Sequence, residues 1–116
     1  MYQLRTLELH NANQIRAELA TIGADSSWLN DQTDLESLYA IRLDSISTKL
    51  ARFLYQEMML EGGIVVLPTR MDDRSLNPVN VIIFGTHTQV EHLAVRLRTQ
   101  SVDELDILAD ELEHEL

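Results

Sequence analysis

Two glycine-containing stretches have residue types that can hold a phosphate group. The first is Gly62-Gly63, and the second is "FGTHTQ", residues 84 to 89. A phosphate site normally follows a strand and opens a helix, because the first helical turn offers N–H groups and the positive end of the helix dipole. Gly62-Gly63 has the reverse order, since it closes a helical pattern and opens a β-branched run. We therefore interpret this pair as a helix stop.

The second stretch does have the order strand, glycine, helix. Amides between Thr86 and Gln89 would face a bound anion, and the His87 ring would assist. Arg70 and Arg74, in the loop before the strand, would supply positive charge. A plain capped turn is the alternative, because every strand-to-helix turn shares these features. The candidate ligand-binding residues are Gly85, Thr86, His87, Gln89, Arg70 and Arg74.

Other site chemistry has weaker support in the sequence. The chain has no cysteine, so a thiol nucleophile, a disulfide and a thiolate metal site are excluded. His87 and His92 are five residues apart, not the four that would place two ligands on one helix face, and we predict no metal and no cofactor. Glu57, beside the apolar Met58, is a candidate general base, with pairing to an arginine as the alternative. A small acid–base enzyme using Glu57 or His87 ranks last among our hypotheses.

Composition and charge exclude several classes of partner. The 116 residues suit one domain, 1–116, and carry a formal net charge of −10. Residues 101 to 116 hold seven acids and no lysine or arginine. Such a chain repels phosphate backbones and anionic membranes, so we predict neither nucleic-acid nor membrane binding. No apolar run approaches the roughly 20 residues of a membrane span, and the first residues lack a signal-peptide pattern. With no cysteine, we expect a cytoplasmic protein.

Hydrophobic periodicity predicts the order βαβαββαα. The predicted strands are 2–9 with a bulge near Leu4, 37–45, 64–67 and 79–85; helices begin near residues 11, 45 to 47, 86 and 102. This order favours an α/β (α+β) two-layer sandwich, with helices packed on one mixed sheet of about four strands. Pro68 places the third strand at an edge. In the polar loop 24–37, we expect Trp28 and Leu29 to pack as a lid on the core.

Two motifs carry a family resemblance. "YQEMMLEGG" and "VIIFGTHTQVEHLAVRLRTQ" resemble the N-terminal extension that precedes the barrel in long-form dihydropteroate synthases of some bacteria and archaea. The pattern departs at Tyr55, Glu61 and Ile64, where the family has Lys, Leu and Asp. The matching residues are Gln56, Glu57, Met58, Gly62, Gly63, Gly85, Thr86, Gln89, Leu93, Ala94 and Leu97.

The resemblance implies a domain without synthase activity of its own. In the family, a barrel of about 250 residues joins p-aminobenzoate to a dihydropterin pyrophosphate, and its motifs are absent here. A chain that matches only the extension would act by self-association, as a homo-oligomer, or by docking on a folate-pathway protein. The alternative is a domain that binds a pterin or a phosphate-containing ligand at the turn of residues 84 to 89.

Overall fold

The structure is a computed structural model that describes residues 2–27, 29, 35–71 and 77–116. The order of its elements confirms the predicted α/β class and the predicted alternation of strands and helices. The elements are β1 (Gln3–Leu7), α1 (Ala12–Thr21), the 3-10 helix η1 (Leu35–Ser37), β2 (Tyr39–Ile46), α2 (Thr48–Leu60), β3 (Ile64–Val66), β4 (Val79–Gly85), α3 (His87–Arg98) and α4 (Asp103–His114). None of the helices in these ranges is long and apolar enough to cross a bilayer.

The four strands form one sheet in the order β1-β2-β4-β3, and every neighbouring pair is antiparallel. We had expected a mixed sheet, and that prediction is wrong, because the sheet is entirely antiparallel. The reason is the position of β4, which lies between β2 and β3. These two strands run in the same direction and are joined through α2, but they do not pair. As predicted, β3 is an edge strand and β4 is internal.

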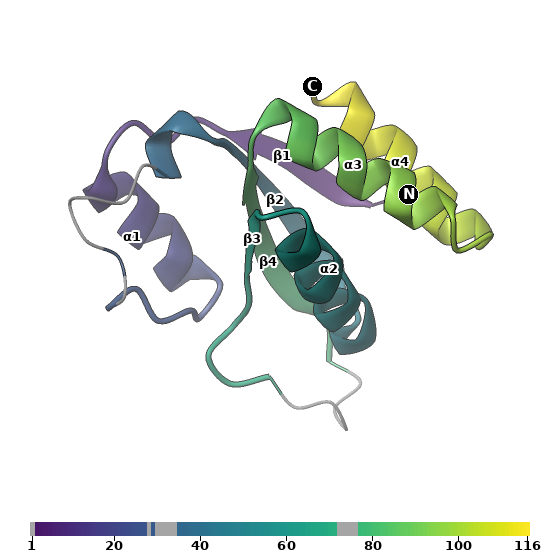
Figure 1. The fold of residues 1–116 in the computed structure, drawn as a ribbon. Coiled ribbons are helices and arrows are strands. Elements are labelled where there is room, and N and C mark those ends of the chain that lie inside the picture. Colours follow the sequence, from purple (N-terminus) through teal and green to yellow (C-terminus); the bar gives the residue numbers. More distant parts are fainter. Residues whose placement is uncertain (1, 28, 30–34, 72–76) are drawn as a thin grey trace.

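The sheet is covered on both faces, so the molecule has three layers instead of two (Figure 1). Helices α2, α3 and α4 pack over the face that carries Ile41 and Ile83. Helix α1 packs with η1 over the face that carries Ile82 and Phe84. The cause lies in β4, whose residues 81 to 84 are all apolar and fully buried. A strand that is apolar on both faces requires cover on both faces.

The predicted bulge in β1 is wrong. β1 keeps a regular register with β2, from Gln3↔Asp44 to Leu7↔Ala40. Leu4 seemed out of phase because it packs toward the α2 side, whereas Leu7 packs toward α1. The irregularity lies in β2, between Leu43 and Ile46.

Local capping fixes the starts of three helices. The side chains of Asn11, Ser47 and Thr86 accept hydrogen bonds from the first turns of α1, α2 and α3. Leu29 is buried in the α1-side core, as expected for a lid, while Trp28 lies outside the described residues.

Candidate functional site

The turn at Gly85–Gln89 is a complete capping box. The Thr86 N–H donates to Gln89 Oε1 at 2.9 Å, and the Gln89 N–H donates to Thr86 Oγ1 at 3.1 Å. The turn therefore satisfies two of the amides that we expected to face an anion. Thr86 and Gln89 form the T-x-x-Q pattern that is typical of such a box.

The two glycine stretches meet around one methionine, and we call this contact the glycine junction (Met58, Gly62, Gly63, Gly85 and Gln89). A Cβ added to Gly63 would lie 2.6 Å from Met58 Cε, and one added to Gly85 would lie 2.4 Å from the same atom. Gly62 has φ +85°, a conformation that favours glycine, and closes α2. Much of the motif behind the family resemblance is thus required by packing alone.

Arg70 does not lie at this turn. β3 runs antiparallel to β4 with Ile64 opposite Phe84, so the loop after β3 returns toward Val79, at the other end of β4 (Figure 1). The seven residues of β4 span about 20 Å. In that loop the Thr69 N–H donates to the Gly23 carbonyl at 2.8 Å. Arg70 is exposed there, and Arg74 lies outside the described residues.

Glu57, one of the two acid–base candidates, and the nearby Glu61 are both paired with residues of α3. Glu57 Oε2 accepts a hydrogen bond from Arg96 at 3.1 Å, so the arginine alternative is the observed one. Glu61 accepts from Arg96 at 2.5 Å and lies 2.8 Å from His92 Nδ1. Hydrogen bonds from Arg96 and then His92 lower the pKa of the Glu61 carboxyl below its usual 4.5. These contacts tie the end of α2 to α3.

His87 is exposed at the start of α3. Its Nδ1 lies 3.1 Å from Glu91 Oε1, and its ring meets the edge of Tyr39. Within the described ranges, no three histidine or acidic side chains are grouped so that they could hold a metal ion.

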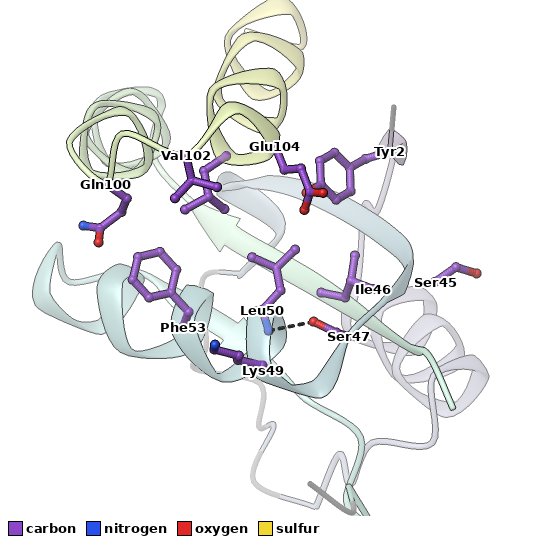
Figure 2. Close-up of a pocket in the computed structure, with 11 residues that line it drawn as sticks. Tyr2, Ser45, Ile46, Ser47, Lys49, Leu50, Phe53, Gln100, Val102 and Glu104 are labelled. Carbon is purple, nitrogen blue, oxygen red and sulfur yellow. Dashed lines mark hydrogen bonds between the residues drawn. The ribbon is translucent and has the colours of Figure 1, made fainter. Parts of the chain in front are cut away.

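A groove that we did not predict separates α2 from the turn between α3 and α4 (Figure 2). Its volume is about 590 Å³, and Leu50 and Phe53 of α2 face Val102 across it. Ser47 on its floor is occupied in capping α2, where it accepts from the Leu50 N–H at 3.1 Å. The groove shares no residue with the site predicted from the sequence. Its lining comes from three separate stretches of chain, so no contiguous motif signals it.

The β3 edge combines an open strand with exposed apolar side chains. Among the residues that the structure describes, β3 is the last strand of the sheet and pairs with β4 alone. Ile64 is 38% exposed, and Tyr55, Met59 and Leu60 of α2 are 39%, 55% and 70% exposed. A groove of about 470 Å³ follows the strand between Tyr55 and Asp25. An uncovered edge beside apolar side chains is a surface suited to strand addition.

Comparisons of the chain with protein-family models, with curated proteins and with solved structures find no match. The resemblance to the dihydropteroate synthase extension therefore stays a prediction.

Proposed function

We propose that this chain is a non-catalytic interaction domain that self-associates through the edge of its sheet at β3. The observation that carries the proposal is the β3 edge, where exposed Ile64 and Tyr55 of α2 line one groove and Met59 and Leu60 are exposed near the end of α2. Exposed large apolar side chains gathered at one place are typical of protein–protein contacts.

Two copies can pair through β3 about a two-fold axis. The outward N–H and C=O groups of each strand find partners on the other copy, and two four-stranded sheets become continuous. β3 has three residues, so strand pairing alone buries little surface. A stable interface needs about 800 Å² per partner, and the apolar end of α2 lies in position to supply more of that area.

The resemblance adds an alternative partner, a folate-pathway protein, to this proposal. We also propose a cytoplasmic location, with which the absence of cysteine is compatible. The ligand alternative, a pterin or a phosphate-containing molecule at the Gly85–Gln89 turn, gains no geometric support, because Arg70 is held at the other end of β4. A thermal-shift screen with pterins, p-aminobenzoate and pyrophosphate tests that alternative, and a shift of several degrees would revive it.

Light scattering tests the self-association. We expect a mass near twice the chain mass of 13.3 kDa, and a monomer mass for Ile64→Lys, because a charge on an edge strand opposes pairing. The matched control is Ile107→Lys on α4, where a side chain of similar exposure, 43%, lies away from β3; it should remain dimeric.

A wild-type monomer at all accessible concentrations would refute self-association. A dimer in which Ile64→Lys has no effect would place the interface away from β3.

A further inference from the structure

The other edge of the sheet, at β1, is hydrogen-bonded to side chains of α4. The Tyr2 N–H, just before β1, donates to the Glu111 carboxylate at 3.2 Å, and the Thr6 N–H donates to Glu115 Oε1 at 3.1 Å. Amides alternate in direction along a strand, so these two point to the same side, away from β2. Glu111 and Glu115 are one helical turn apart and lie on one face of α4.

The two glutamates reach β1 across a gap. A groove of about 370 Å³ lies between the strand and the helix, and it is lined by Tyr2, Leu4, Asp110, Glu111, His114 and Glu115. The helix itself is fixed elsewhere, because its apolar stripe is buried in the core and Arg98 of α3 binds both Asp110 and Glu113. The carboxylates can therefore be removed without removing the packing that holds α4.

We infer that Glu111 and Glu115 prevent the β1 edge of the sheet from pairing with a strand of a second copy of this chain. The carboxylates accept hydrogen bonds from backbone N–H groups that an incoming strand would need. They also place negative charge in the position that this strand would take. The occupant that they exclude is the open β3 of another copy. Pairing of β1 with β3 joins unlike surfaces, so it would build rings or open chains of molecules instead of a two-fold dimer. The inference concerns a different edge from the proposed function, but it rests on that function's open β3, for which the two kinds of pairing compete.

Amide exchange and mass, measured on the same samples, test the inference. In Glu111→Ala/Glu115→Ala, the Tyr2 and Thr6 amides should exchange at least about tenfold faster, because each loses a charge-assisted hydrogen bond. The mass at equal concentration should rise above that of the wild type, because each exposed β1 edge then competes for the β3 edge of another copy and extends the pairing beyond two molecules. Adding Ile64→Lys should abolish the rise, because it blocks β3.

Two variants distinguish protection of β1 by Glu111 and Glu115 from a general effect on charge or folding. Glu111→Gln/Glu115→Gln keeps an acceptor at each position and should restore most of the amide protection. Glu113→Ala removes the same charge from α4 but contacts Arg98, not β1, and should leave both amides unchanged. Circular dichroism confirms that each variant is folded.

Unchanged exchange in the double alanine variant would show that the carboxylates do not protect the edge. Faster exchange with an unchanged mass would show that the exposed edge does not pair. A rise in mass that persists with Ile64→Lys would overturn β3 as the occupant. Each of these results would overturn the inference as stated.

Discussion

The two edges of the sheet are treated in opposite ways. At β1, Glu111 and Glu115 of α4 accept the outward N–H groups of Tyr2 and Thr6. At β3, the strand is short, Ile64 is exposed, and the adjoining end of α2 is apolar. Charged side chains at an edge oppose association, whereas an apolar open edge invites it. The difference is consistent with our proposal that this sheet pairs at β3 and not at β1.

Part of the acidic C-terminal segment, residues 101 to 116, contacts the β1 edge. We interpreted its acids as a solvated helix face, and several of them do lie exposed. Two others, Glu111 and Glu115, face the first strand of the chain. They are 109 residues from their partners in sequence, so the closure of β1 depends on the last helix returning along the first strand.

Gly63→Ala should have the largest effect, because the added methyl group would clash with Met58, against which the start of β3 is packed. The added Cβ would lie within 2.9 Å of Met58 Cε, Cγ and Sδ, and the buried Met58 has little room to move. We expect a loss of about 1–3 kcal/mol in the free energy of unfolding, measured with urea. The dimer should also weaken, since Ile64 follows directly, while the exchange of the Thr6 amide at β1 should not change.

Gly23→Ala is the matched control for that variant. Gly23 has φ +74° and no atom within 4 Å of an added Cβ, so alanine there costs backbone strain alone, about 1 kcal/mol. The dimer should be unaffected. If Gly63→Ala left dimerisation intact while destabilising the fold, the junction would not be what positions the pairing edge.

Glu61→Gln should have a smaller effect that depends on pH. Because Arg96 and His92 lower the pKa of Glu61 in the folded state, its charge stabilises the fold above its usual pKa of 4.5. That contribution is lost as the pH falls through the lowered pKa. The melting temperature of the variant should lie below that of the wild type at pH 7, and the two should converge once the pH falls below the lowered pKa of Glu61. A gap that widened in acid would contradict this assignment.

Local sequence patterns predicted most of the fold. Asn11 and the T-x-x-Q box gave the helix starts, Pro68 indicated the edge strand, and the apolar run 79–85 indicated an internal strand. The layering was missed, although the unbroken run at residues 81 to 84 signals a strand buried on both faces. A period-two alternation was the pattern that we sought, and β4 does not have one.

The candidate site was harder to predict, because its parts depend on long-range contacts. Arg70 is near Gly85 in sequence, yet the direction of β3 carries the loop to the far end of β4. Conversely, Met58 touches both Gly63 and Gly85, and no local pattern links the two glycines. The closure of β1 by Glu111 was equally hidden, because its spacing fits any amphipathic helix.

The smallest effect that we predict is a shift in the titration of Tyr2. Burial raises the pKa of its phenol above the usual 10.0, and the negative charges of Glu104 and Glu111 raise it further. Glu111→Gln removes one of these charges, so the pKa of Tyr2 should fall toward 10.0, as followed by NMR of labelled tyrosine rings. Glu113→Gln, which changes the same charge on α4, should leave it unchanged. An unaltered Tyr2 titration in Glu111→Gln would mean that Glu111 does not lie beside β1 in solution, and the contrast between the two edges would then rest on Glu115 alone.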